Sequence, residues 1–479
     1  MLEDFCYEGI WWLPDDHEYK ISGSLEFKAG HSITLRLSGI FRYKKGVYLK
    51  PEIILGRTKN NEKVTLFETI ETNWHRNFLS HEETPETQLL GDSTFVSNYV
   101  FVGEHFTNKD RINFHSIYIS FTYLEQWLSP KAPLGLEFGE DDYVVKFKHL
   151  ENYNIYLKAI NSTLSIHDSL GSDGDRWTNL NLTHISYLKI TPENIKELEW
   201  HMKIVYNIEN LLTLLIGSPV YAKALIAEGD EIQQFKERGI SKRAEIKIYS
   251  ILPDPKIRPE KYLWDMRSTF PKLVNYQGKD YLNIIINNWF DKQALLQPVC
   301  ELFFSNYYNP SMYPHVCFLS LLQALEAFHR RIYGGKYLSD NEYKSVCDTI
   351  VNAIPSSIED SFRESLRNKI IYGNEFSLRK RLLEFTKTKR VSWFELTIGK
   401  DKKLVSKIVA TRNYLTHYDD KSKKGIFEYG DILHMNEKLN ELLSILLLEQ
   451  IDTPTEILFD IVHDLCKTED HREAIRSQQ

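Results

Sequence analysis

The spacing of apolar residues changes near residue 190, and this change constrains the fold more than any other feature of the sequence. Before that point, apolar and polar residues alternate in short runs such as Lys20 to Phe27 and Ser116 to Tyr123, a pattern typical of strands that bury one face. After it, apolar residues recur every third or fourth position, as in amphipathic helices. The sequence therefore predicts an α+β protein with an antiparallel β-rich N-terminal region, sandwich-like or barrel-like, and a C-terminal helical bundle.

Three regions follow from this pattern. We expect a β-rich domain over residues 1–190, a mainly helical connecting region over 191–310 and a helical domain over 311–479. A length of 479 residues suits about three domains.

Two short motifs predict where helices begin. The order Thr191–Pro192 is that of a helix N-cap and first helical residue, so we expect a helix there that continues to Leu215. Ser339 and Glu342 have the spacing of a capping box, which predicts a second helix start.

Composition limits the class of protein. Aromatic residues make up 13% of the chain, too many for a largely disordered protein. The five cysteines lie far apart and form no zinc-binding pair, so we expect free thiols in a reducing cytoplasm and no metal or other cofactor. The most apolar stretch, Asn210 to Ala227, contains Gly217, Pro219 and Lys223, so we expect no membrane-spanning helix.

Positive charge is concentrated in one segment. The whole chain has a net charge of -7, yet residues 363–424 contain 17 Lys or Arg and 7 Asp or Glu, a net charge of +10. Such a segment is either a phosphate-facing surface or a set of solvated helix faces. The charge count by itself favours neither interpretation.

Within this basic segment, Arg412 precedes His417 by five positions. Cleavage of RNA without a metal ion needs a base that takes the proton of the ribose 2′-hydroxyl near neutral pH, and a cation that holds the phosphoryl group. Histidine, with a pKa of about 6.5, suits the first task, and the planar guanidinium of arginine suits the second. Because the RNA supplies the nucleophile, the pair is a candidate ribonuclease site.

The same spacing occurs in Arg76 and His81, and a chain with 20 arginines and 16 histidines should contain roughly one such pair by chance. We interpret Arg76 and His81 as coincidence, because they occupy a polar stretch of the β-rich region. For Arg412 and His417, the competing interpretation is an arginine paired with a nearby acid and a solvated histidine. On an ideal helix the two side chains diverge by about 140°, so either the helix ends near Thr416 or two copies of the chain contribute to one site.

A helical domain with Arg-Asn-x-x-x-His in a late helix resembles the HEPN family, which is rich in RNA-cleaving toxins and defence effectors. The segment Leu321 to Arg330 resembles the glutamate-bearing first helix of these domains, and Met435 to Glu449 resembles their closing helix. The whole layout, with Gly9-Ile-Trp-Trp-Leu-Pro14 at the start of a β-rich region, resembles the ApeA-like family of anti-phage abortive-infection proteins.

This resemblance implies roles for individual residues. Arg412 and His417 would be catalytic, and Asn413 would support them. Glu326 would lie on the first helix, either as a partner of Arg412 or as an exposed carboxylate. His329 and its arginine neighbours would be either phosphate contacts or a solvated helix end. Four further residues are candidates for contact with RNA, with core packing as the alternative for the tyrosine: Lys402, Lys403, Lys407 and Tyr418.

The resemblance also implies a function. The chain would be a cytoplasmic, metal-independent endoribonuclease that cleaves RNA, with tRNA as the expected substrate, and would act as a homodimer or higher homo-oligomer. Its N-terminal region would sense a phage-derived trigger protein. The alternative is a non-catalytic HEPN-type protein that binds or dimerises and acts with a partner such as a nucleotidyltransferase.

The tryptophans of the N-terminal region allow two interpretations. Trp11, Trp12, Trp74 and Trp127 are expected in the core. The alternative is that they line the ligand face of a carbohydrate-binding sandwich.

Overall fold

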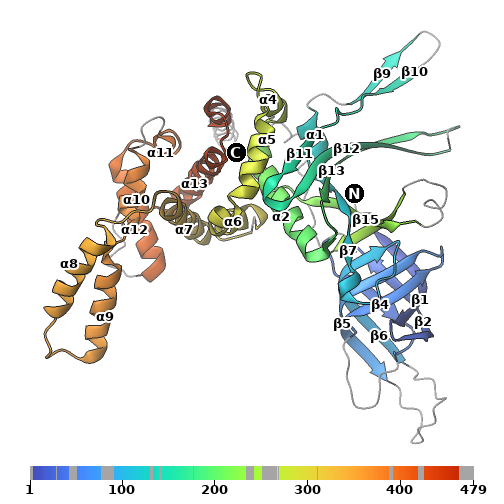
Figure 1. Ribbon diagram of the computed structural model, residues 1–479, viewed down its shortest axis with the longest axis horizontal. Helices are drawn as coiled ribbons and strands as arrows, with labels where there is room; N and C mark the ends of the chain where they lie inside the picture. The colour runs from blue at the N-terminus through green and yellow to red at the C-terminus, as the bar shows by residue number, and fades with distance from the viewer. Residues whose placement is uncertain are drawn as a thin grey trace, which may run out of the picture. The chain divides into compact units, whose positions relative to one another are not determined.

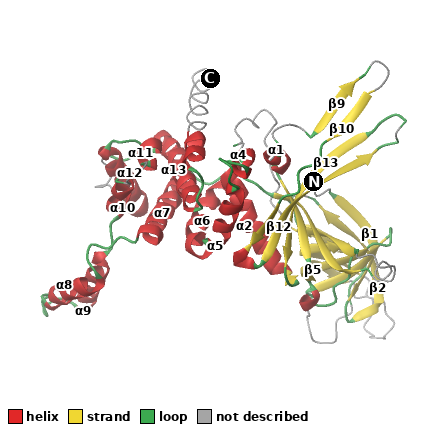
Figure 2. Cartoon of the chain, turned by 45° about the horizontal axis from the view of Figure 1, so that its top comes forward, coloured by secondary structure: helices red, strands yellow, loops and turns green. Residues whose placement is uncertain are grey.

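The computed structural model divides into two compact units, Met1–Phe290 and Asp291–Gln479, and each is described by itself (Figures 1 and 2). The residues that it describes are 4–28, 30–41, 51–76, 91–129, 133–139, 143–175, 177–232, 242–250, 267, 269–309, 311–387, 392–418 and 425–462. The expected α+β class is confirmed, because the first unit is built on antiparallel strands and the second on helices.

Six strands of the first unit close into a small barrel. Each strand is antiparallel to both neighbours in the order β1-β2-β3-β6-β5-β4, and β4 pairs with β1 to complete the ring. The strands are β1 (Phe5–Leu13), β2 (Asp16–Phe27), β3 (Ile33–Leu37), β4 (Ile53–Thr58), β5 (Lys63–Arg76) and β6 (Gly91–Val102).

Alternate residues of these strands point inward and form the barrel core. Trp11 is fully buried there, and its indole Nε1 donates a hydrogen bond to the carbonyl of Gly23, at 3.2 Å. A Cβ on Gly56 would lie 2.1 Å from the Trp11 ring, so β4 needs a glycine where the indole crosses it. Trp12 and Trp127 are buried as well, which confirms the core interpretation for these three residues. The side chain of Trp74 lies outside the described residues.

An open sheet continues from the barrel through β6, in the order β16-β15-β8-β13-β12-β11. Helix α2 (Leu198–Ile216) and helix α5 (Tyr281–Asp291) pack their apolar side chains against this sheet, around residues such as Ile166 and Leu188. The strands are β8 (Ser116–Phe121), β11 (Asn154–Leu157), β12 (Ser162–Asp173), β13 (Asn181–Pro192), β15 (Ala222–Glu231) and β16 (Arg243–Ser250). The smaller elements are β7 (Asn113–Phe114), β14 (Lys196–Glu197), the hairpin of β9 (Leu134–Phe138) and β10 (Tyr143–Phe147), α1 (Leu124–Leu128) and α4 (Phe270–Val274).

The helix start expected at Thr191 is wrong. Thr191 and Pro192 are the last residues of β13, opposite Thr163 and Ser162 of β12, and α2 begins only at Leu198. The long ladder between the two strands outweighs the local capping signal, because it satisfies the backbone groups of the whole segment. Residues 191–310 therefore contribute strands β15 and β16 as well as helices.

The second unit is built on helices. Helix α7 contacts α6, α13, α10 and α12, and α13 also contacts α11. The helices are α6 (Gln293–Tyr308), α7 (Pro314–Tyr333), α8 (Asp340–Asn352), α9 (Asp360–Ile371), α10 (Leu378–Phe385), α11 (Trp393–Thr397), α12 (Lys402–His417) and α13 (Tyr429–Gln450). The capping box expected at Ser339 and Glu342 is present at the start of α8. Among the helices of the described ranges, none has the length and apolar character needed to span a membrane.

Candidate functional site

Helix α12 carries the candidate catalytic pair, and its own residues fix where it begins and ends. The Asp401 carboxylate caps the helix by accepting a hydrogen bond from the backbone N–H of Lys403, at 2.8 Å. At the other end, Tyr418 adopts a left-handed conformation with φ of 49°, while its N–H still bonds to the carbonyl of Tyr414. The last turn of α12, which contains His417, therefore keeps its backbone hydrogen bond.

One face of α12 is buried. Val405, Ile408 and Thr411 form its buried stripe. Thr411 accepts a hydrogen bond from the N–H of Phe427, at 2.9 Å, and this bond ties the helix to the segment before α13. The stripe leaves Arg412 half-buried at its edge.

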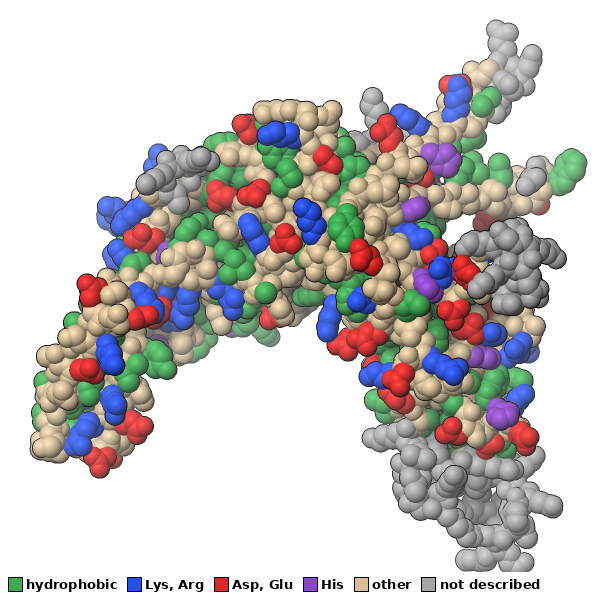
Figure 3. Space-filling model, in the orientation of Figure 1, with side chains coloured by type: hydrophobic (Ala, Val, Ile, Leu, Met, Phe, Trp, Pro, Cys, Tyr) green, Lys and Arg blue, Asp and Glu red, His purple; other side chains and the backbone are tan. Residues whose placement is uncertain are grey.

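Arg412 lies in a groove of about 560 Å³ between α7 and α12. Its guanidinium Nη1 donates to Oδ1 of Asn413, at 3.2 Å, so Asn413 does contact the arginine. Space-filling side chains show Lys and Arg gathered on this part of the helical unit (Figure 3). Polar residues that line the groove with Arg412 are Gln323, Glu326, Arg330, Arg331 and Thr416.

Glu326 faces the groove from α7 but is paired along its own helix. Its Oε1 lies 3.4 Å from Nη2 of Arg330 in an i,i+4 ion pair, and its side chain is 26% exposed. The structure thus brings Glu326 and Arg412 to one groove. Arg330 forms the ion pair with this carboxylate, and the buried Arg381 is also close enough to interact with its charge.

His417 is not among the described residues that line this groove. It is exposed at the last position of α12, and the helix is continuous between Arg412 and His417. Since residues five positions apart on one helix diverge by about 140°, a single chain presents the two side chains in different directions. Arg76, of the second pair, is the last residue of β5, and His81 lies outside the described residues.

The residues proposed for RNA contact have different surroundings. Lys402 and Lys403 are exposed in the first turn of α12. Lys407 is engaged within the chain, because its Nζ lies 3.0 Å from Oδ2 of Asp431. Tyr418 is 61% exposed, so core packing is the wrong interpretation for this residue.

A buried arginine beside the C-terminal end of α7 was not expected from the sequence. The side chain of Arg381, on α10, is fully buried and donates hydrogen bonds to the carbonyls of Gly334 and Phe376, to the Glu375 carboxylate and to Nδ1 of His329. These bonds join the end of α7 to α10. The expectation that His329 is solvated or contacts phosphate is wrong.

His329 is 2% exposed, and burial together with the nearby Arg381 charge lowers its pKa to about 4. The neutral ring is the form that accepts a hydrogen bond from Arg381. One signal was available in the sequence, since His329 continues the spacing of Leu322 and Leu325 on the buried face of α7. Arg381 gave no such signal.

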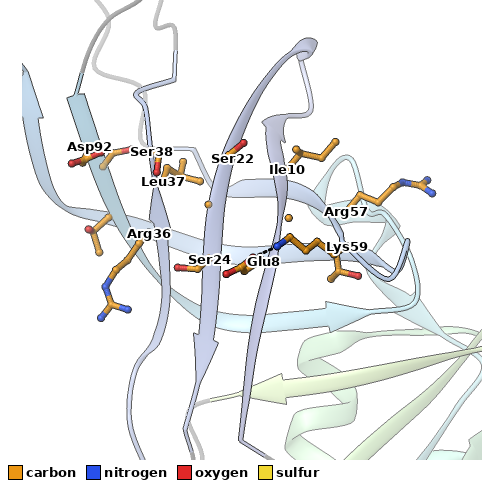
Figure 4. Close-up of a pocket in the computed structure, with 15 residues that line it drawn as sticks. Glu8, Ile10, Ser22, Ser24, Arg36, Leu37, Ser38, Arg57, Lys59 and Asp92 are labelled. Atoms are coloured by element: carbon orange, nitrogen blue, oxygen red, sulfur yellow. Dashed lines mark hydrogen bonds and ion pairs between the residues drawn. The ribbon is translucent and has the colours of Figure 1, made fainter.

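A second hollow, of about 740 Å³, lies on the outer surface of the barrel (Figure 4). Small hydroxyl side chains such as Ser22 and Ser24 form its floor. The basic side chains at its edge have acceptors within the sheet: Arg36 bonds to Glu26, Arg57 to Asn61 and Lys59 to Glu8. Because these charges are already paired, we place the candidate chemistry in the helical unit.

The described residues contain no group of three or more His, Cys, Asp or Glu side chains that could hold a metal ion. Cys6, Cys300, Cys317 and Cys347 are free thiols, and burial raises the pKa of Cys300 to about 12. Cys466 lies outside the described residues.

Comparison with known families gives two matches. Residues 6–289 match the family described as ApeA N-terminal domain 1, and residues 319–457 match Apea-like HEPN. No curated protein and no solved structure matches significantly. The first match covers more than half of the chain, and the second contains Glu326, Arg412 and His417. The chain therefore belongs to the ApeA family and carries an ApeA-like HEPN domain after its ApeA N-terminal domain.

Proposed function

We propose that this ApeA-family chain is a HEPN-type defence effector that cleaves RNA without a metal ion, through Arg412 and His417. The observation that carries the proposal is the position of Arg412. It lies half-buried in a groove between α7 and α12, next to Arg330 and Arg331, within the HEPN match. Three guanidinium groups around one groove form a suitable site for a phosphodiester.

The proposed reaction is an attack of the ribose on its own phosphate. His417 takes the proton of the 2′-hydroxyl, the 2′-oxygen bonds to phosphorus, and the bond to the 5′-oxygen breaks. The 5′-oxygen leaves with a proton from water, and His417 returns its proton to the solvent, so the products are a 2′,3′-cyclic phosphate and a 5′-hydroxyl. Arg412 stabilises the charge that develops on the phosphoryl oxygens.

We further propose that two copies of the chain build each site. Arg412 and His417 diverge on one continuous helix, yet the reaction requires both at one phosphate. Two antiparallel α12 helices related by a two-fold axis would place the arginine of one copy near the histidine of the other. The Asn413 side chain, bonded to Arg412, would hold the guanidinium in position.

The substrate that we propose is tRNA, because single-stranded loops expose the 2′-hydroxyl and allow bases to be splayed out. Tyr418 is exposed at the end of α12 and would stack on such a base. The β-rich unit would receive a phage-derived trigger protein and control the helical unit.

The experiment is an analysis of cleavage products with wild-type protein and RNA, with and without EDTA. We expect 2′,3′-cyclic phosphate and 5′-hydroxyl ends, unaffected by chelation, and a loss of at least about 1,000-fold in rate for Arg412→Ala and for His417→Ala. Arg76→Ala and His81→Ala are matched controls and should keep the wild-type rate. Activity that disappears with EDTA and returns with Mg²⁺ would contradict the mechanism. RNA binding with no cleavage at any protein concentration would favour the non-catalytic alternative.

A further inference from the structure

Helices α8 and α9 form an arm that buries none of its helical residues. The two helices pack on each other and project from the rest of the helical unit (Figures 1 and 2). Their lengths are 13 and 12 residues, and isolated helices of this length are only marginally stable in water. An arm of this kind gains most of its stability from a surface that covers it.

The base of the arm is firmly attached. Asn374 is buried and exchanges two hydrogen bonds of 2.9 Å with the backbone of Leu338. The Tyr343 hydroxyl donates to the carbonyl of Ile370 across the two helices. The arm is therefore tied to α10, since the Glu375 carboxylate at its base also bonds to the buried Arg381.

Large apolar side chains of the arm face solvent. Val346 and Ile350, one turn apart on α8, are 40% and 45% exposed, and Phe362 on α9 is 52% exposed. They lie beside the half-buried residues that hold the two helices together, such as Cys347 and Leu366. Large exposed apolar side chains with charged neighbours, as on this arm, are typical of a protein-binding surface.

The charge of the arm indicates what covers it. Residues 339–371 contain six acidic and four basic side chains, so the arm is mildly acidic and unsuited to RNA. Helix α12 contains three lysines and Arg412 and no acidic residue. Lys402 and Lys403 are exposed in its first turn, away from Arg412. A second copy of the chain thus offers the complementary charge.

We propose that the α8–α9 arm of one copy docks on the first turn of α12 of a second copy, and that the two copies exchange arms around a two-fold axis. A helix of 13 residues is about 20 Å long, and neighbouring helices pack about 8–10 Å apart, so the arm is long enough to reach across a neighbouring helix. The exchange would hold the two α12 helices together and leave Arg412 and His417 free at their far ends. The inference concerns association and does not depend on RNA cleavage.

The first test measures association of the full-length chain by sedimentation velocity. Ile350→Asp with Phe362→Asp should weaken the dimer at least tenfold. Because both side chains are exposed in the single chain, circular dichroism and the unfolding temperature should match those of the wild-type monomer, both measured below the concentration of dimer formation. Leu433→Asp on α13 is the matched control, since Leu433 is also 45% exposed, and should associate like wild type. A wild-type chain that is monomeric at 10 µM would overturn the inference.

The second test exchanges charges between the two surfaces. One variant carries Asp348→Lys and Glu364→Lys on the arm, and the other carries Lys402→Glu and Lys403→Glu on α12. Each variant should fail to self-associate, because its arm and its α12 then have the same sign. An equimolar mixture should associate, because each arm then meets the opposite charge. Wild-type association of either variant, or a mixture that stays monomeric, would overturn the inference.

The two proposals fail separately. A chain that dimerises through the arm and does not cleave RNA would refute the ribonuclease and retain the arm. RNA affinity that falls in the Ile350→Asp, Phe362→Asp variant, with association unchanged, would show that the arm serves RNA and would overturn the docking inference.

Discussion

The barrel and the helical unit stabilise their interiors in different ways. The barrel core consists of aromatic and aliphatic side chains such as Trp11 and Phe95, and basic residues such as Arg36 stay on the outside in ion pairs. The helical unit buries Arg381 completely and gives it four acceptors. An apolar core tolerates substitutions that keep its volume, whereas a buried charge requires every partner in place.

This difference indicates where exact side-chain position matters. Arg381 joins the end of α7 to α10, and α7 supplies Glu326, Arg330 and Arg331 to the groove. The buried network therefore holds the wall of the groove in a defined position. In the described part of the barrel the core cluster is apolar, and the charges around the hollow are paired at the surface.

The largest stability effect should come from removing the buried arginine. Arg381→Met should destabilise the helical unit by about 3 kcal/mol, because it leaves two backbone carbonyls and Nδ1 of His329 without their donor. Hydrogen exchange of α7 and α10 peptides measures this loss, with peptides of β1 to β3 as the internal control. Arg36→Met on the barrel should cost less than about 0.5 kcal/mol, because its ion pair is exposed. Equal losses would contradict the comparison.

The second prediction concerns acid. The native state keeps His329 neutral because its pKa is lowered to about 4, whereas the unfolded chain takes up the proton below about pH 6.5. The contribution of neutral His329 to the free energy of unfolding is therefore complete above pH 6.5. It is lost as the pH falls toward 4, by up to about 3 kcal/mol. His329→Gln should remove this part of the pH dependence, as followed by hydrogen exchange of α7 between pH 4 and 7. An unchanged pH profile would mean that His329 is solvated.

The smallest expected effect is a difference among the lysines of α12 in how much each contributes to the salt dependence of RNA binding. RNA affinity should fall steeply with salt, because each neutralised phosphate releases counterions. Lys402→Glu with Lys403→Glu should lower the slope of log affinity against log salt, measured below the concentration of dimer formation, where no arm covers these two lysines. Lys407→Gln should change it less, because Lys407 is already paired with Asp431. A slope that depends on Lys407 as strongly as on the two exposed lysines would show that the Asp431 pair opens when RNA binds.

Periodicity predicted the elements well where a single face of an element is buried. The helices over 314–333, 402–417 and 429–450 and the strands over 16–27 and 116–121 follow their apolar spacing. The helix start at Thr191 was wrong because pairing with β12 is a long-range contact that no local motif reports. The sequence could not predict that β4 and β5 close the barrel, because this closure depends on the register of strands far apart in sequence.

The candidate site was only partly predictable. Arg412, Asn413 and Glu326 could be singled out from spacing and resemblance, and the structure brings them to one groove or into contact. Arg381 could not, because an arginine on a short helix predicts exposure and its four partners come from separate segments. The exposure of Tyr418 depends on its own left-handed conformation, which ends α12. A glycine would have indicated such a helix end in the sequence, and there is none at this position.

The most direct test of the central claim, a site shared by two copies around Arg412 and His417, is the specific activity of the wild-type chain as it is diluted. Cleavage per chain and the fraction of dimer, measured on the same samples by mass photometry, should fall together through the same midpoint concentration. A monomer that retains full activity at nanomolar concentration would contradict the shared site.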